Sequence, residues 1–249
     1  QMYFNPNLRE IYIGDTVRFD LISDSQLNYF DIAIDSMVTD SVAAPYDLVY
    51  IFDCEGPYHL SLTGYTGTVC QNIVRHDTTI IVLNRNPEIE VVTVDDKAIQ
   101  IDWSIDEPSG SEKLFLQKNN QGLWFNLGVF ALQGGSFKDS LVSVNESSYQ
   151  YRLSNQQNCF EKAGSLPHES ILLQLHSDSL EGVRQVSLDW NAYINWPDGV
   201  DYYEAMLSVD GSAFEPVYQG PRLNSKFEYK NLGFEHCFQV RAMEKNGYN

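Results

Sequence analysis

Histidine, cysteine, serine and acidic side chains most often carry catalysis or bind metals, and this chain of 249 residues holds five histidines. None stands in a His-Glu-x-x-His pair, and the steps from Cys159 to His168 and from His168 to His176 are not zinc spacings. There is no Gly-x-Ser-x-Gly elbow and no Walker loop. We therefore predict no catalytic residue, no metal ligand and no cofactor. The histidines are expected in solvated loops: His59, His76, His168, His176 and His236.

Acidic residues outnumber basic residues by 34 to 16, which gives a net charge of −18 and an isoelectric point near 4.4. A surface this acidic repels phosphate backbones, so nucleic acid is excluded as a main partner. Asp198, Asp201 and Glu204 are close in sequence, but no Asp-x-Asp-x-Asp-Gly loop indicates calcium. Paired acids for glycoside hydrolysis need a cleft that small sandwiches do not supply. The sequence therefore predicts a protein that is not an enzyme.

Two aromatic residues, Tyr193 and Trp196, flank a loop near the C-terminal end of the chain. Exposed aromatic rings can stack on sugars, so these two are candidate ligand-stacking residues. The alternative is that both rings pack under a neighbouring strand or at a domain junction, which the Trp196-Pro197 pair favours.

The four cysteines are an even number, which in an exported chain suggests two disulfides. If a turn near residues 65–68 joins antiparallel strands, Cys54 lies roughly 30 Å along the strand from the position opposite Cys70. Bonded cysteines have Cα atoms only about 4.4–6.8 Å apart, so a Cys54–Cys70 bridge is disfavoured unless the chain bends back. The pairing of Cys54, Cys70 and Cys159 is left open.

The elements that must position these residues follow a period-two alternation of apolar and polar side chains, which predicts strands. No apolar run approaches the ~18–20 residues of a membrane helix, so no transmembrane segment is expected. Expected strands cover 11–21, 28–34, 48–52, 58–62, 79–83, 88–94, 99–105, 113–118, 123–130, 149–153, 170–175, 186–190, 203–207 and 238–242. A helix over His168–Leu175 is the alternative for one of these segments.

A repeat organises the second half of the chain. Val186-Ser-Leu-Asp-Trp190 parallels Ile99-Gln-Ile-Asp-Trp103, and 46 residues separate Trp103 from Tyr149 and Trp190 from His236. Equal spacing indicates tandem copies of one plan. We predict an all-β chain of three domains, at residues 1–85, 86–175 and 176–249.

The tryptophan on the second strand and the late Tyr-x-apolar-x-apolar strand resemble the fibronectin type III fold, a seven-stranded sandwich. This resemblance puts Tyr149 at a tyrosine corner, where its hydroxyl bonds an upstream backbone group, whereas His236 replaces that tyrosine in the third domain. The first domain resembles immunoglobulin-like PKD modules through Gly14–Phe19 and Gly56–Leu62. The fold class implied is tandem immunoglobulin-like and fibronectin type III-like β-sandwiches.

A more specific resemblance covers residues 85–249. The segments Ser148–Leu153, His168–Leu172, Leu188–Tyr203 and Cys237–Glu244, together with Cys159, resemble the region before the sorting domain of Bacteroidetes gliding-motility-associated surface proteins. That family implies export by type IX secretion through the periplasm and outer membrane to an extracellular, cell-surface location. The function implied is a non-catalytic spacer, adhesin or component of the gliding or secretion machinery, with protein partners at the surface and glycan as a further candidate. The alternative is a carbohydrate-binding accessory protein of a secreted polysaccharide-degrading system, with Tyr193 and Trp196 as its stacking residues.

The C-terminal end carries one more expectation. A fibronectin type III domain needs a seventh strand after the one ending near Ala242, and Lys245-Asn-Gly247 is typical of the turn into it. In the resembled family a cysteine follows shortly after this stretch. We therefore expect the natural protein to continue beyond Asn249 and to supply both the strand and a disulfide partner for Cys237.

Overall fold

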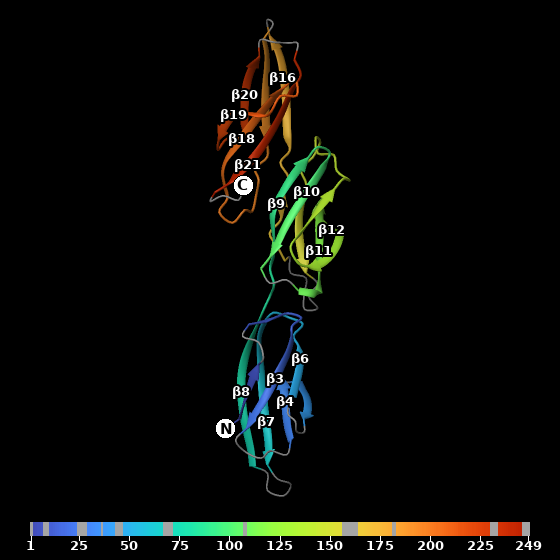
Figure 1. Cartoon of the computed structure of the whole chain (residues 1–249), viewed down its shortest axis with the longest axis vertical. Helices are drawn as coiled ribbons and strands as arrows, with labels where there is room; N and C mark the ends of the chain where they lie inside the picture. Colours follow the sequence, from blue (N-terminus) through green and yellow to red (C-terminus); the bar gives the residue numbers. More distant parts are fainter. Residues whose placement is uncertain are drawn as a thin grey trace. The chain divides into compact units, whose positions relative to one another are not determined.

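A computed structural model describes residues 2–6, 10–23, 29–35, 37–42, 47–66, 72–106, 109–155, 164–180, 183–229 and 234–245. Every regular element among them is a β-strand (Figure 1). No helix long and apolar enough to cross a membrane occurs in these ranges. The chain divides into two compact units, the first formed by 1–85 with 156–161 and the second by 86–155 with 162–249.

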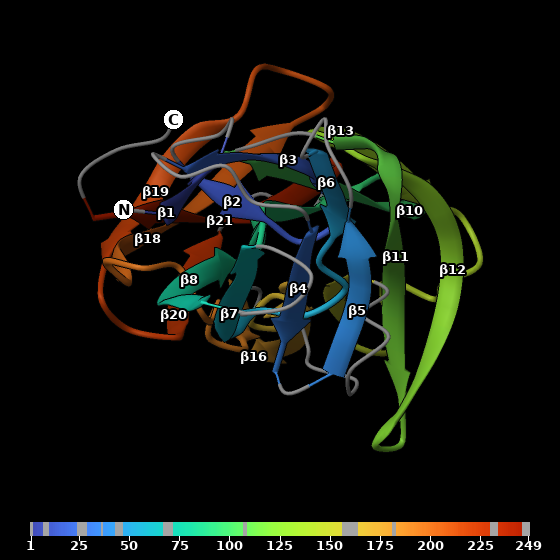
Figure 2. The ribbon, with the colours of Figure 1, turned by 90° about the horizontal axis from the view of Figure 1, so that it is seen from below.

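The first unit is a two-layer sandwich, with β3 and β6 on one side and β4, β7 and β8 on the other (Figure 2). One sheet has the order β1-β3-β6 and the other β2-β8-β7-β4-β5. The strands are β1 (Met2–Pro6), β2 (Ile11–Tyr12), β3 (Thr16–Ser23), β4 (Tyr29–Ile34), β5 (Met37–Val42), β6 (Asp47–Ile51), β7 (Gly56–Thr66) and β8 (Asn72–Leu83). Alternate residues fill the core, among them Val17, Phe19, Ile32, Leu60 and Leu62. This arrangement is immunoglobulin-like, as predicted.

The single strand expected over 11–21 is wrong, because the chain changes sheets in the middle of it. Gly14 has a φ of 77°, and the Tyr12 amide donates to the Asp15 carboxylate at 2.9 Å. This turn lets β2 pair in parallel with β8 in one sheet while β3 pairs with β1 and β6 in the other. A left-handed φ suits glycine, so the break is encoded at Gly14.

The second unit contains two successive sandwiches with the same strand plan. The former has sheets β13-β10-β9 and β12-β11-β14-β15, and the latter has sheets β16-β17-β20 and β19-β18-β21. The strands of the former are β9 (Pro87–Asp95), β10 (Ala98–Ile105), β11 (Ser109–Asn120), β12 (Leu123–Leu132), β13 (Gly135–Asp139), β14 (Gln150–Asn155) and β15 (His168–Glu169). The strands of the latter are β16 (Leu173–Leu180), β17 (Val183–Trp190), β18 (Val200–Val209), β19 (Glu215–Gly220), β20 (Asn224–Tyr229) and β21 (His236–Glu244).

The sequence repeat corresponds to this structural repeat. Trp103 on β10 and Trp190 on β17 are both buried, and each lies on the middle strand of a three-stranded sheet. The predicted tyrosine corner is confirmed, since the Ser143 amide donates to the Tyr149 hydroxyl at 2.9 Å. His236 occupies the matching position in the next sandwich. Its Nδ1 atom is 3.0 Å from the carbonyl oxygen of Phe234, two residues upstream. The fold is therefore tandem fibronectin type III-like sandwiches in this unit.

The helical alternative over His168–Leu175 is wrong, and the strand expected over 170–175 is right only from Leu173 onward, where it opens the next sandwich instead of closing the first. The chain instead leaves the first of these sandwiches after β15 and enters the second at β16, which begins at Leu173 and pairs with β17. Asn191 holds the connection between them: its Oδ1 accepts the Leu172 amide at 2.6 Å and its Nδ2 donates to the Ser170 carbonyl at 3.1 Å. These side-chain bonds replace sheet bonds at the crossing.

Cys54 is disulfide-bonded and Cys237 has a free thiol, while Cys70 and Cys159 lie outside the described residues. β7 is paired with β8 without interruption from Gly56 to Thr66, so it is extended over this whole length. At ~3.3 Å per residue, the Cα atoms of Gly56 and Thr66 are about 33 Å apart. Cys54 precedes Gly56 by two residues and Cys70 follows Thr66 by four, so even fully extended connections of ~3.6 Å per residue leave the Cα atoms at least ~11 Å apart. That separation exceeds the ~6.8 Å limit for a disulfide.

We therefore predict that Cys54 is bonded to Cys159, the cysteine that remains once Cys70 is too distant and Cys237 is free. Mass spectrometry of a non-reducing proteolytic digest should find one peptide pair that joins these two cysteines, and reduction should separate it. A digest in which Cys54 is joined to Cys70 would contradict the prediction.

Candidate functional site

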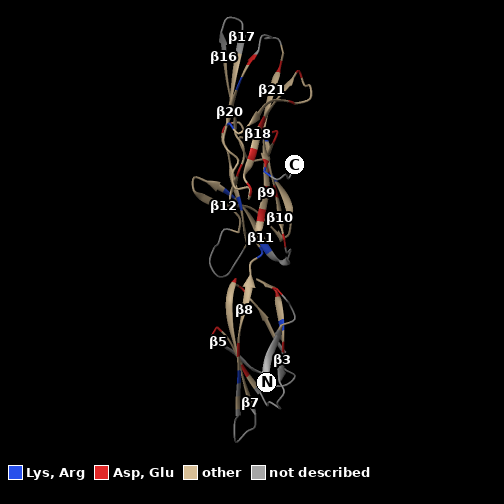
Figure 3. Ribbon diagram, turned by 90° about the vertical axis from the view of Figure 1, so that its left-hand side faces the viewer, with Lys and Arg blue, Asp and Glu red and all other residues tan. Residues whose placement is uncertain are grey.

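The candidate acidic site does not form. Glu204 is buried on β18 and accepts a hydrogen bond from the Arg241 guanidinium at 2.7 Å, whereas Asp198 and Asp201 are exposed. Among the residues that the structure describes, no group of three or more histidine, cysteine or acidic side chains could hold a metal ion. In Figure 3 the acidic positions lie on several strands and loops of each unit.

Asp139 is a second buried charged group among the described residues of this unit, and both of its carboxylate oxygens accept hydrogen bonds. Asp139 accepts hydrogen bonds from the Tyr151 hydroxyl and from Lys118 Nζ, each at 2.9 Å, and from the Leu141 amide at 3.0 Å. Burial is the largest cause that raises the pKa of Tyr151, so its hydroxyl stays protonated and keeps donating. This cluster ties β11, β13 and β14 together and leaves no group free to act on a ligand.

Tyr193 and Trp196 lie on the loop between β17 and β18, where they bind the backbone of β9. The Val92 amide donates to the Tyr193 hydroxyl at 2.8 Å, and the Trp196 indole N–H donates to the Glu90 carbonyl at 2.7 Å. β9 is the edge strand of its sheet, so these bonds satisfy groups that would otherwise lack a protein partner. The loop therefore caps a sheet edge of the preceding sandwich.

The rings of this loop are also packed together. Tyr193 and Trp196 have centroids 4.1 Å apart, and Tyr193 is only 6% exposed. The Tyr203 hydroxyl accepts the Tyr193 amide at 3.0 Å, and Asn195 donates to the Pro167 carbonyl. This is the packed arrangement at a junction that the Trp-Pro pair favours. Stacking of these rings on a sugar stays a prediction, with little of the Tyr193 ring open to a ligand.

The expectation that the histidines lie in loops is wrong for all five, which are on strands: His59 on β7, His76 on β8, His168 on β15, His176 on β16 and His236 on β21. His168 is also buried, which the sequence analysis missed. It lies on β15, is 3% exposed, and its Nδ1 is 3.0 Å from the Tyr193 hydroxyl. Burial lowers the pKa of His168 to about 4, so the imidazole is neutral at pH 7. The Tyr193 hydroxyl accepts the Val92 amide and forms a second hydrogen bond with the imidazole, whose tautomer decides which of the two groups donates.

The result is a chain of hydrogen bonds from β9 through Tyr193 to β15. Burial raises the pKa of Tyr193, which keeps its hydroxyl protonated. Three segments that are far apart in sequence meet at one hydroxyl group. A buried network whose members are all satisfied specifies one packing of its elements.

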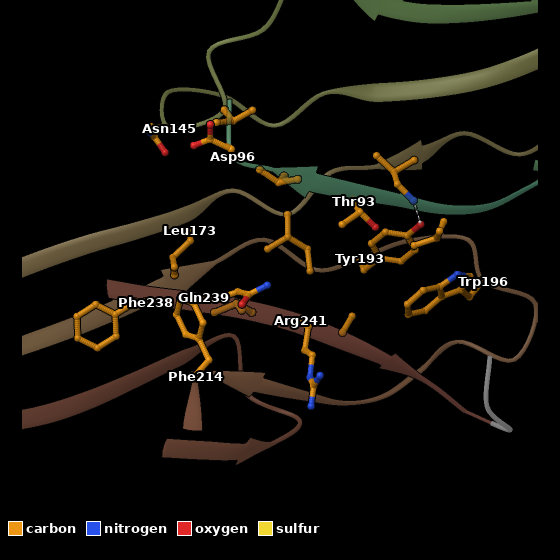
Figure 4. A pocket seen from close by; sticks show the side chains of 17 residues that line it. Thr93, Asp96, Asn145, Leu173, Tyr193, Trp196, Phe214, Phe238, Gln239 and Arg241 are labelled. Carbon is orange, nitrogen blue, oxygen red and sulfur yellow. Dashed lines mark hydrogen bonds between the residues drawn. The ribbon is translucent and has the colours of Figure 1, made fainter. Parts of the chain in front are cut away.

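Beside this network lies a groove of about 620 Å³ (Figure 4). One wall is β9 at Val91–Val94 and the opposite wall is β21 at Phe238–Ala242. In both walls consecutive residues line the groove, rather than every second one, so the groove faces the edges of these strands. Tyr193 and Trp196 lie at one end of it and Phe214 and Phe238 lie away from them (Figure 4).

Comparisons with known proteins bear on the fold alone. No family model and no curated protein matches the chain. The fibronectin(III)-like modules of Clostridium thermocellum CbhA are 12% identical over 68% of this chain and 92% of theirs, with a TM-score of 0.28. The central fibronectin-III array of RIM-binding protein is 12% identical over 98% and 91%, with a TM-score of 0.26. Tandem domains of titin are 11% identical over 99% and 94%, also at 0.26. The strand order described above is what identifies the sandwiches.

We predict a pH dependence of stability that comes from His168. Its pKa in the folded state is about 4, below the ~6.5 of an unfolded histidine, so the unfolded chain binds more protons between these values. The stabilisation is fully present above pH 6.5 and is lost as pH falls toward 4. Between pH 7.5 and pH 5 the free energy of unfolding should fall by about 2 kcal/mol more in the parent than in His168→Asn. Urea unfolding at both pH values measures this.

His176→Asn, at an exposed position on β16, is the matched control for the histidine-to-asparagine substitution itself. Equal slopes for the parent and His168→Asn would show that His168 is not buried in the neutral form.

Loss of the Tyr193 hydroxyl should leave the Val92 amide and His168 Nδ1 without their partner. We expect Tyr193→Phe to lower the free energy of unfolding by about 1–3 kcal/mol, the cost of buried polar groups that lose a hydrogen bond. Tyr202→Phe, at a half-buried position on β18 outside this network, should change it by less than about 0.5 kcal/mol. Equal effects of the two variants in chemical unfolding would contradict the bridging role.

Proposed function

We propose that this chain is a non-catalytic segment of an exported surface protein, in which the two fibronectin-type sandwiches act as one stiff spacer. The observation that carries the proposal is their shared core. A single hydrophobic cluster includes Leu116 and Tyr151 of one sandwich together with Leu188, Tyr193 and Ala205 of the other. Tandem domains joined only by a linker move independently, whereas domains joined through a buried apolar interface do not.

The junction also supports stiffness through directional bonds. The loop between β17 and β18 bonds β9 through Tyr193 and Trp196, and Asn191 bonds the connecting segment. Hydrogen bonds to fixed backbone groups define an angle between the sandwiches as well as a contact. A stiff rod of this kind suits a spacer that holds a binding domain away from a cell surface.

The proposal also includes export and a location at the cell surface, and the sequence supports both. The motifs in residues 85–249 resemble gliding-motility-associated proteins exported by type IX secretion, and the disulfide at Cys54 fits an oxidising compartment. The role within such a system is that of spacer, adhesin or component of the gliding or secretion machinery. Its partners are then other proteins of the outer membrane or cell surface.

Stiffness can be tested by pulsed electron paramagnetic resonance. Spin labels on non-canonical amino acids at the exposed positions Phe125 and Val217 leave the cysteines unchanged. We expect a narrow distance distribution in the parent and a broader one in Trp196→Ala, which loses the bond to Glu90. Trp124→Ala is the control, because Trp124 packs on Arg152 within one sandwich. A broad distribution in the parent would refute the stiff spacer.

Export can be tested in the source bacterium. Protease added to intact cells should degrade the protein, and deletion of the type IX outer-membrane channel should protect it by retaining it in the periplasm. Protection in cells with an intact channel, together with recovery in the cytosol, would contradict surface location and leave the stiffness result unaffected.

A further inference from the structure

One edge strand of the second unit differs from the others in charge. The four sheets of this unit have two edge strands each, and those that carry at least one charged side chain are β9, β13, β15, β16, β19, β20 and β21. The exception is β12, which has ten residues and no charged side chain. Charged side chains and proline on an edge strand hinder its pairing with another chain. β12 has neither, and among the described residues it pairs with β11 alone.

The repeat provides a direct comparison for this edge. β12 follows β11 and β19 follows β18, and each of the two lies at the same end of its sheet (Figure 1). β19 contains Glu215 and Pro216, which protect an edge. β12 instead has three large apolar side chains that are more than half exposed: Leu123, Phe125 and Val129. Two copies of one strand plan therefore differ in how the same edge is protected.

A β-bulge decides which part of β12 can pair with a further strand. Along β11 the partner changes from Gly128 to Asn126 in one step, so Leu127 is the extra residue. A bulge bends its strand and interrupts the ladder. The segment 128–132 lies after the bulge and is continuous up to the end of β12. This segment is therefore the longer regular part of the edge.

Both faces of the segment 128–132 are apolar at the edge. On the inner face the ring of Phe130 lies 5.1 Å from that of Trp103 and 5.9 Å from that of Phe137, and both phenylalanines are only partly buried. On the outer face Val129 and Ala131 are exposed. A strand paired with this edge would cover apolar groups on both sides of the sheet.

We propose that residues 128–132 form a self-association surface, where the same segment of a second copy of this chain pairs antiparallel across a two-fold axis at Phe130. Opposed residues of antiparallel strands point to the same face, so the axis has to pass through a residue. An axis at Phe130 keeps the bulge outside the pairing. It places Val129 opposite Ala131 of the second copy and joins two four-stranded sheets into one.

Charge and composition both favour a second copy as the occupant. Each copy has a net charge of −18, so two copies repel one another except where the surface is uncharged, as it is along β12. A basic partner would be drawn to the acidic strands instead. The occupant must itself be uncharged and apolar on both faces, and β12 is the edge strand described in this unit that meets both conditions. This inference does not depend on the proposed spacer function.

Sedimentation equilibrium of the chain tests the proposal. Pairing through one short strand buries less than a standard interface, so we expect a weak dimer with a dissociation constant on the order of 100 μM. Val129→Lys places a charge in the interface and should weaken the dimer at least tenfold. Val217→Lys makes the same change at the exposed valine of β19 and should leave the dimer unchanged. A chain that stays monomeric up to about 1 mM, or equal weakening by both variants, overturns the proposal.

Nuclear magnetic resonance of a mixture of isotope-labelled and unlabelled copies tests the register. An intermolecular Overhauser effect should connect the methyl groups of Val129 in one copy with that of Ala131 in the other. The edge amides of 128–132 should exchange about threefold more slowly at about 1 mM than at about 50 μM, whereas those of β19 should not change. A dimer whose intermolecular contacts lie on other strands, with β12 amides that do not respond to concentration, refutes the assignment of this surface.

Discussion

The hydroxyl group of Tyr193 is the point on which the second unit depends. It accepts the amide of Val92 on an edge strand and is hydrogen-bonded to the buried imidazole of His168, and the tyrosine ring packs on Trp196. Sheet edges carry backbone groups that need partners, and a sandwich meets this need with a further strand, a covering loop or water. Here a loop of one sandwich covers the edge of the other, so edge protection and domain junction are the same contact.

The same constraint organises the rest of the unit. The edge of β14 is covered by the two-residue strand β15, and the edge of β9 by the aromatic loop. The edge of β21 borders an apolar groove, and the partial burial of Val240 reflects this. Three similar edges thus have three different environments, although the two sandwiches share one strand plan. What differs between the copies carries more information about function than what they share.

A strand could be predicted from the sequence where one of its faces is buried and the other is exposed to solvent. Ile99, Ile101 and Trp103 alternate with polar residues, and all three are buried on β10. The first half of β8 was not expected as strand, because its Arg75, His76 and Asp77 pair with β7 without burying a continuous apolar face. The turn at Gly14 and the crossing between β15 and β16 were also missed, since apolar residues continue through both breaks.

The junction could not be derived from local patterns. Val92 and Tyr193 are 101 residues apart, and nothing in the spacing of either residue marks the other as its partner. His168 has a polar side chain in a short segment, which ordinarily indicates a solvated position, yet burial by the following domain leaves it neutral. The Trp196-Pro197 pair was the one local signal, and it favoured packing at a junction.

The most direct measurement of this account is hydrogen exchange at the amide of Val92, followed by nuclear magnetic resonance. If the Tyr193 hydroxyl closes the edge of β9, this amide should exchange as slowly as the paired amides of β10, and the Tyr193→Phe variant should lose that protection. An amide of Val92 that exchanges as fast as those of exposed loops in the parent protein would contradict the central claim.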